Sequence, residues 1–169
     1  MFRVHEQNPT DDVEEAFFRI QRVNMVDVPI LNSALSVEAV DFQGWQGHWL
    51  GIVVTPWCMS MLLVPGSQEN WVSIGENKRR FVRFPAGDFA FLGSEEAELG
   101  EYQSCSLFSP MGKFSTQSEA VMTARASLLA LLANPEHPVP SSPASSTTPP
   151  GEPSLSRRRF LALGRTNGR

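Results

Sequence analysis

The sequence predicts an α+β domain: a mainly antiparallel sheet built from hairpins, with an N-terminal and a C-terminal helix packed on it. Two segments have helical periodicity, and they flank a region of short apolar segments separated by Gly, Pro and Asn. Strands grouped between terminal helices are typical of α+β folds, whereas α/β folds alternate strands with helices. The most apolar stretch, 51–65, predicts a buried strand, a break at Pro56, which has no N–H to donate, and a second extended piece.

The two helices have start and stop signals. Thr10 can cap the first helix, because the acidic residues of the next turn favour the positive end of the helix dipole, and the dipeptide 28–29 ends it. Thr116 or Ser118 can cap the second helix, whose apolar residues recur at helical spacing until 134–135 closes it. We expect each helix to pack one face on the sheet.

The predicted strands form a series of hairpins between these helices. The dipeptide 43–44 is the expected turn of the first hairpin, and 75–78 and 85–87 are the next expected turns. Four glutamates between 94 and 101 predict a solvated loop. The predicted strands are 36–42, 45–55, 57–65, 71–74, 79–84, 89–92 and 103–109.

Alternation along the strands predicts two faces that carry large apolar side chains. Trp45 and Trp49, four residues apart in one predicted strand, would share a face. Trp57, Met59 and Met61 would share a face of the next strand. Because Met fills irregular gaps and also adapts to varied peptide segments, this second face can be plain core or a partner-binding surface. The residues alone leave both interpretations open.

Charge separates the chain into an acidic body and a basic end. Residues 1–155 carry 9 Lys and Arg against 18 Asp and Glu, whereas residues 156–169 carry five Arg and no acid. An acidic body argues against nucleic-acid binding, which needs a basic face, and it suits a partner that presents arginines. We expect neither a secretory signal nor an apolar run long enough to insert in a membrane, and therefore a cytoplasmic protein.

Composition also predicts the domain boundaries. Residues 1–133 are long enough for one domain with a core of its own and no disulfides. Residues 134–155 are rich in Pro, Ser and Thr, which predicts a flexible or polyproline-like linker. Residues 156–169 form a basic tail that begins with SRRRFL, the pattern of a twin-arginine export signal at the wrong end of the chain. We expect this tail to be disordered.

No catalytic constellation or metal site is predicted. The histidines are scattered, His48 stands alone in a strand, and the two cysteines, Cys58 and Cys105, lie in separate apolar segments. We therefore expect no enzyme activity, no metal and no cofactor. A small redox or metal-handling protein that uses both thiols is the alternative from another class.

The aromatic content points to a binding groove. Four Trp and eleven Phe occur beside a surplus of carboxylates. An apolar, aromatic groove with an acidic rim would suit a peptide with an arginine pair and an apolar segment, because guanidinium groups pair bidentately with carboxylates. The candidate rim carboxylates are Glu38, Asp41, Asp88, Glu95, Glu96 and Glu98.

Several motifs, in a fixed order, resemble one protein family. They are Pro29 with Asn32, VEAVDF at 37–42, Trp45 with WLG at 49–51, TPWCMSMLLVP at 55–65, FPAGDF at 84–89, and Tyr102 with CSLFSPM at 105–111. Over residues 17–132 the chain is similar to the HybE/HupJ (HoxT-like) assembly chaperones of nickel-iron hydrogenases.

The resemblance implies a non-catalytic cytoplasmic chaperone for an uptake hydrogenase. Such a protein would bind the small-subunit precursor and its twin-arginine signal until cofactor insertion is complete, and a rubredoxin-like protein is a further implied partner. The predicted partner contacts are Trp45, Trp49, Trp57, Met59 and Met61, the carboxylates Glu38, Asp41 and Asp88, and Phe108 and Met111 of the last motif. A scaffold that holds other maturation proteins without touching the signal is the alternative.

The basic tail allows two interpretations. It is either a segment that contacts the acidic body or a partner nonspecifically, or an imitation of the client's signal that occupies the groove. In the second interpretation Arg157, Arg158, Phe160 and Leu161 would take the place of the client's own residues.

Overall fold

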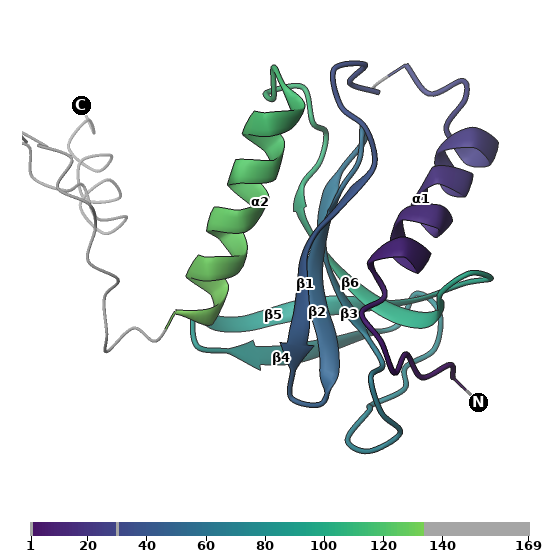
Figure 1. Ribbon diagram of the computed structural model, residues 1–169, viewed down its shortest axis with the longest axis vertical. Helices are drawn as coiled ribbons and strands as arrows, with labels where there is room; N and C mark the ends of the chain where they lie inside the picture. The colour runs from purple at the N-terminus through teal and green to yellow at the C-terminus, as the bar shows by residue number, and fades with distance from the viewer. Residues whose placement is uncertain (1, 30, 134–169) are drawn as a thin grey trace, which may run out of the picture. The chain divides into compact units, whose positions relative to one another are not determined.

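A computed structural model describes residues 2–29 and 31–133 (Figure 1). The chain divides into two units, residues 1–138 and 139–169, and every described helix and strand belongs to the first unit. The predicted linker and the basic tail, with Arg157, Arg158, Phe160 and Leu161, lie outside the described residues. The domain boundary at residue 133 therefore stays a prediction.

The described residues form two helices and six strands, and the predicted α+β class is confirmed. The strands make one sheet with the order β1-β2-β3-β6-β5-β4, and each neighbouring pair is antiparallel. The elements are α1 (Thr10–Asn24), β1 (Glu38–Trp45), β2 (His48–Val54), β3 (Met59–Val64), β4 (Arg79–Phe84), β5 (Gly87–Glu96), β6 (Gly100–Phe108) and α2 (Gln117–Leu132).

The sheet is coiled, and the two helices cover its two faces. In Figure 1, β1, β2 and β3 stand between α1 and α2, while β4 and β5 run crosswise below them. Under α2 lies a buried cluster that includes Ile52, Met61 and Phe91, which we call the α2-side core. Under α1 lies a second cluster that includes Val53 and Leu62, the α1-side core. β3 is buried along its whole length because both of its faces are covered.

The first hairpin turns at Gln46-Gly47, three residues later than predicted. Both residues have positive φ, 50° and 80°, as a two-residue type I′ turn requires. Trp45 therefore ends β1, opposite the first residue of β2. Gly44, the expected turn residue, lies inside β1 opposite Trp49. The new register places the two tryptophans on different strands.

A bulge interrupts β1 between Val40 and Gln43, where Asp41 has a φ of 50°. The bulge bends the strand, and the ring of Phe42 enters the α1-side core over Gly51 of β2. A Cβ atom at Gly51 would stand 2.4 Å from that ring, so glycine is required for the close approach.

The second half of the sheet differs from the prediction in two places. Residues 71–74 form no strand; instead the carboxylate of Glu101 accepts hydrogen bonds from the Ser73 hydroxyl, at 2.7 Å, and from the next backbone N–H, at 3.2 Å. Residues 94–101 are not a free loop, because β5 and β6 continue through most of them and Gly100, with φ 75°, completes a short turn. The glutamates of this segment therefore sit on a hydrogen-bonded hairpin.

The helix caps differ from each other. Thr10 is the first residue of α1 and not its cap, and its hydroxyl donates to the side-chain oxygen of Asn8 at 2.6 Å. Thr116 caps α2 as predicted, because its Oγ1 accepts the N–H of Glu119 at 3.1 Å. In the part of the chain that the structure describes, no helix has the length and apolar character needed to cross a membrane.

Candidate functional site

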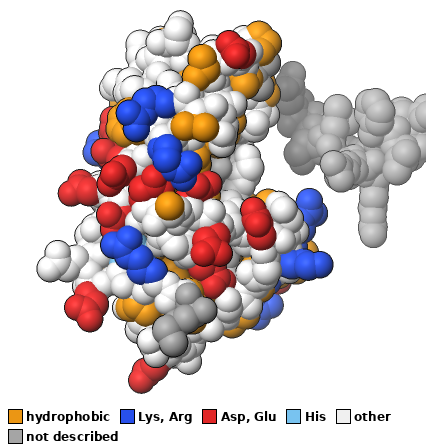
Figure 2. All heavy atoms as spheres, turned by 90° about the vertical axis from the view of Figure 1, so that its right-hand side faces the viewer, with side chains coloured by type: hydrophobic (Ala, Val, Ile, Leu, Met, Phe, Trp, Pro, Cys, Tyr) orange, Lys and Arg blue, Asp and Glu red, His pale blue; other side chains and the backbone are white. Residues whose placement is uncertain are grey.

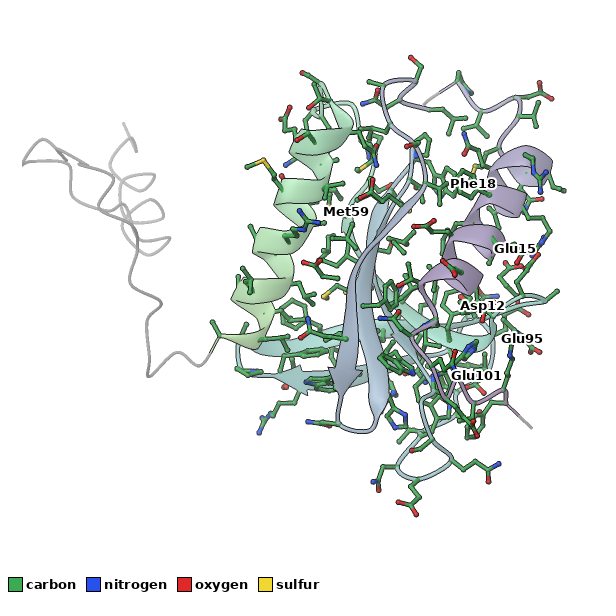
Figure 3. The ribbon with its side chains drawn as sticks, in the orientation of Figure 1. Asp12, Glu15, Phe18, Met59, Glu95 and Glu101 are labelled. Atoms are coloured by element: carbon green, nitrogen blue, oxygen red, sulfur yellow. The ribbon has the colours of Figure 1, made fainter. Side chains whose placement is uncertain are left out.

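Three of the predicted partner contacts are core residues. Met59 and Met61 are 0% and 1% exposed, and Met111 is 0% exposed. Figure 3 shows Met59 between α2 and the sheet, and all three side chains belong to the α2-side core. Their burial contradicts an open groove at these methionines, because α2 covers that face of β3. Of the two interpretations of this face, the structure selects the plain core.

The three predicted tryptophans do not share a surface: the shared face of Trp45 and Trp49 is wrong, and the second predicted face holds for Met59 and Met61 but not for Trp57. Trp45 packs against the α2-side core, where its ring stacks on Phe84 with centroids 4.7 Å apart. Trp49 packs on the α1-side core, and its Nε1 donates to the carbonyl of His5 at 2.8 Å. Trp57 also packs on the α1-side core, because it precedes β3 in a turn and does not follow the alternation of that strand.

The three carboxylates among the predicted partner contacts, Glu38, Asp41 and Asp88, have partners within their own chain. Glu38 accepts from Gln117 of α2 at 3.2 Å, Asp41 lies 3.5 Å from Arg125 of α2, and Asp88 lies 3.2 Å from Arg83 of β4. Phe108 is half-buried at the end of β6, with the ammonium of Lys113 3.8 Å from its ring centroid. The structure does not bring the ten predicted contact residues together into one groove.

A different surface gathers acidic side chains. Three adjoining pockets of about 660, 420 and 420 Å³ lie along α1, the N-terminal segment and the turn between β5 and β6. Arg3 and Asp11 each line two of them, so the pockets form one continuous surface, which we call the α1 surface. Figure 2 shows this side of the molecule, with acidic and basic side chains gathered across its middle. Its charged residues are Glu6, Asp11, Asp12, Glu14, Glu15, Glu95, Glu96 and Glu101 against Arg3, Arg19 and Arg22.

Arg19 connects α1 to the β5–β6 turn beneath this surface. Its guanidinium group donates to the carboxylates of Glu96 and Glu98, with 2.5 Å between Nε and Oε1 of Glu98. Hydrogen bonds from Arg19 lower the pKa of the Glu98 carboxyl group, and those same bonds raise the pKa of Arg19. Arg3 in turn donates to the carbonyl of Glu98 at 2.5 Å and to Asp12 at 3.4 Å. These two cations are therefore already neutralised by the protein.

Other carboxylates on the α1 surface lack such partners. The side-chain carboxylates of Asp11, Glu15 and Glu95 make no hydrogen bond or ion pair with any residue that the structure describes. Figure 3 shows Glu15 on the outward side of α1 and Glu95 below it, near the end of β5. Asp11 lies in the first turn of α1. All three carboxylates are exposed and free to accept donors from a partner.

The α1 surface also has an apolar part. Phe18 lines the same pocket as Glu14 and Glu15 and is 43% exposed. Towards and beyond the end of α1, Val23 and Val26 are 67% and 68% exposed. Phe18 is therefore an apolar side chain that lines these pockets beside the carboxylates, and Val23 and Val26 are exposed farther along the chain without lining any of the three pockets.

Sequence reasoning found part of this surface. Glu95, Glu96 and Glu98 were among the candidate rim carboxylates, and they do lie beside α1. It missed Asp11 and Glu15, which were assigned only to the helix start, and it also missed Phe18. The available signal was that Phe18 falls outside the helical stripe that the buried residues Val13, Ala16 and Phe17 define.

The described residues offer little basis for metal binding or for thiol redox chemistry. No group of three or more His, Cys, Asp or Glu among them is placed to hold a metal ion. Cys58 and Cys105 are free thiols; Cys105 packs on the α2-side core, where burial raises its pKa, and Cys58 lies at the turn before β3. Burial disfavours the thiolate that redox chemistry requires. The candidate site among the described residues is therefore the α1 surface, which offers carboxylates and an exposed apolar side chain.

Comparison with known proteins identifies the family. The sequence profile of the family described as NiFe-hydrogenase assembly chaperone HybE matches residues 8–163. The hydrogenase expression/formation protein HupJ of Bradyrhizobium diazoefficiens is 42% identical over 137 residues, which cover 81% of this chain and 77% of that protein. The solution structure of HybE from Escherichia coli superposes with a TM-score of 0.64 at 26% identity, covering 92% of this chain and 96% of that one.

A further relative is longer than this chain. The match to the probable rubredoxin HupJ of Rhodobacter capsulatus, 38% identical over 130 residues, covers 75% of this chain but 47% of that protein. Taken together, these matches show that the chain belongs to the HybE family of nickel-iron hydrogenase assembly chaperones. It is a hydrogenase-maturation chaperone and not an enzyme.

Proposed function

We propose that the protein is a cytoplasmic chaperone that holds the small-subunit precursor of a nickel-iron uptake hydrogenase, through its twin-arginine signal, until cofactor assembly is complete. Family membership accounts for the hydrogenase-maturation part of this statement. The α1 surface supports the part that concerns the signal, because it joins unpaired carboxylates to exposed apolar side chains.

The arginine pair of the signal would bind the acidic part of the surface. Asp11, Glu15 and Glu95 are exposed and have no partner among the described residues, so a guanidinium group meets them without breaking an existing ion pair. Arginine is favoured over lysine at such a place because its planar fork donates two parallel hydrogen bonds to one carboxylate.

The apolar residues of the signal would bind the other part. In a twin-arginine signal, apolar residues follow the arginines. Phe18 of the α1 surface, and beyond it the exposed Val23 and Val26, follow Asp11 and Glu15 along the chain. An extended signal peptide that lies along α1 in the same direction would therefore place its arginines beside the carboxylates and its apolar residues beside the apolar side chains.

Peptide binding to matched variants tests the proposal. The probe is a synthetic peptide with Ser-Arg-Arg-Xaa-Phe-Leu and an apolar segment, compared with the same peptide carrying Lys-Lys. Glu15→Gln should weaken binding by about tenfold, the effect of one charge-assisted hydrogen bond. Glu76→Gln removes the same charge from an exposed residue that lines none of the three pockets of the α1 surface and should have no effect. Equal affinity for the two peptides, or equal loss in both variants, would contradict the proposal.

Further variants and a pull-down test the apolar contacts of the α1 surface and the role of the signal. Phe18→Ala should weaken binding of the probe, whereas Leu129→Ala, at a residue that is 71% exposed on α2, should not. A pull-down of the hydrogenase small-subunit precursor with and without its signal separates signal recognition from scaffolding. Persistence of the complex after removal of the signal would favour a scaffold for other maturation proteins. The name of the Rhodobacter relative makes a rubredoxin-like protein one proposed partner of such a scaffold.

A further inference from the structure

A separate pocket, of about 400 Å³, lies where the two edges of the coiled sheet approach each other, at the stacked rings of Trp45 in β1 and Phe84 in β4. The β1–β2 turn, the loop residue Asn70 and strand β4 enclose it. Its lining residues are Trp45, Gln46, His48, Leu63, Asn70, Arg80, Phe81, Val82 and Arg83, which include two arginines and no aspartate or glutamate. A basic pocket is unexpected on so acidic a domain.

His48 supplies a buried donor at this pocket. The residue is 5% exposed and its ring stands edge-on to Trp71, with centroids 5.1 Å apart. Nδ1 accepts the N–H of Gly66 at 3.2 Å, so the neutral ring carries its proton on Nε2, which has no hydrogen-bond partner among the described residues. Burial, with a smaller contribution from the charge of Arg80, lowers the pKa of His48, although the nearby carbonyl of Asn70 acts in the opposite direction. At neutral pH the imidazole is therefore an uncharged N–H donor.

Arg80 supplies the charge. Its side chain is half-buried, and Nε donates to Oε1 of Gln103 at 2.6 Å, which holds the guanidinium group in place. No carboxylate in the described part of the chain lies within ion-pair distance of Arg80, whereas Arg83 pairs with Asp88 at 3.2 Å. Burial lowers the pKa of Arg80, but a guanidinium group stays charged at neutral pH. The pocket therefore contains one uncompensated positive charge.

We propose that this pocket binds a carboxylate group carried by an extended segment of a partner protein. The carboxylate would accept hydrogen bonds from the guanidinium group of Arg80 and from Nε2 of His48. One uncompensated cation beside a neutral donor matches the single charge of a carboxylate better than the double charge of a phosphate monoester. The proposal is separate from recognition of the twin-arginine signal, because no residue of the α1 surface lines this pocket.

Two features favour a peptide as the carrier of the carboxylate. Four consecutive residues of β4 line the pocket, so the edge of the strand itself forms a wall, and in the described sheet β4 pairs with β5 alone. An unpaired strand edge offers backbone donors and acceptors to an extended peptide. Trp45 and Phe81, the latter 75% exposed, add apolar surface for a neighbouring side chain.

The test uses the full-length protein and two peptide probes. The first is Ac-Gly-Leu-Asp-Leu-Gly-NH₂ and the second carries Asn in place of Asp. We expect the aspartate peptide to shift the NMR signals of the His48 ring and the Arg80 Nε–H in a saturable way, with a dissociation constant of about 1 mM or tighter. The asparagine peptide should leave these signals unchanged. A third peptide with a free C-terminal carboxylate and no aspartate distinguishes a chain terminus from an acidic side chain.

Charge-matched variants complete the test. Arg80→Gln should reduce affinity for the aspartate peptide at least about tenfold. Arg79→Gln, on the adjacent residue, which does not line the pocket, should leave it unchanged. His48→Phe keeps an aromatic ring but removes the Nε2–H donor. Circular dichroism checks that Arg80→Gln and His48→Phe are both folded. Absence of a saturable shift, equal shifts with the asparagine peptide, or equal loss in Arg79→Gln would each overturn the proposal, whatever the outcome for the signal peptide.

Discussion

Arg19 of α1 and Glu98 of the β5–β6 turn form a direct ion pair, with 2.5 Å between Nε and Oε1. The two residues are 79 positions apart, and the pair holds the first helix against the far hairpin of the sheet. Because Glu96 also accepts from Arg19, the acidic turn stays beside α1 instead of projecting into solvent. The shape of the α1 surface depends on this contact.

The Arg19–Glu98 pair should make stability depend on acid pH. The pKa of Glu98 is lowered in the folded state, so its contribution to the free energy of unfolding is present above the unfolded value of 4.5 and is lost as the pH falls through the folded pKa. Glu98→Gln should reduce stability at neutral pH and flatten the acid side of the stability profile. Urea unfolding between pH 7 and acid conditions measures both effects, with Glu76→Gln as control. An unchanged profile in Glu98→Gln would show that the pair is not formed in solution.

Met59 should respond to substitution as a core residue and not as a binding residue. It is 0% exposed on the central strand, so Met59→Ala should cost about 2–5 kcal/mol of stability through the cavity that it leaves. Met59→Leu conserves the volume and should cost less than about 1.5 kcal/mol. Chemical denaturation measures these differences. Folded Met59→Leu should bind the signal peptide as the wild type does. A large loss of binding without loss of stability would instead support a partner-binding groove at the methionines.

Gly51 should tolerate no side chain while Phe42 is present. A Cβ atom would stand 2.4 Å from the Phe42 ring, so Gly51→Ala should cost about 1–3 kcal/mol by forcing the ring or the strand to shift. In a Phe42→Ala background the ring is absent, and the additional cost of Gly51→Ala should largely disappear. A double-mutant cycle by thermal or urea unfolding measures this coupling. Additive costs would mean that Phe42 does not cover Gly51.

Removal of residues 156–169 should strengthen binding of a twin-arginine peptide. The prediction rests on the proposed function and on charge, since the tail carries five Arg and no acid and begins with SRRRFL. With residues 134–155 as the flexible linker that composition predicts, the 22 residues would span about 25 Å and tethering would supply an effective concentration of about millimolar, so weak self-binding would compete with the client. Titration of the peptide into full-length and truncated protein tests this. Unchanged or weaker binding would exclude self-occupancy, and the variant Arg157→Gln with Arg158→Gln separates the motif from general charge.

Local sequence patterns predicted much of the fold. The caps, the two helical stripes and the apolar alternation lie within a few residues of each other in the chain, so they identified α2 and most strands correctly. The first turn was misplaced because Gln43-Gly44 and Gln46-Gly47 look alike in sequence, and only pairing with β2 selects the second. The segment 71–74 resembles a strand in composition, but side-chain hydrogen bonds to Glu101 occupy it instead.

The candidate site was less predictable, for a physical reason. Whether Met59 faces a partner or a helix depends on α2, which begins 58 residues later. Likewise, Arg19 and Glu98 meet only because the folded sheet brings the turn between β5 and β6 next to α1. Such contacts are set by packing between distant segments, which no local periodicity records.

By itself, the sequence determined the α+β class, the acidic body with its basic end, and the family, because composition, periodicity and motif order are properties of the chain. Only the tertiary structure decided which acidic and apolar side chains are exposed together, because burial depends on which elements cover each other. It buried the methionines, separated the tryptophans, and exposed Phe18 beside Asp11 and Glu15 on α1.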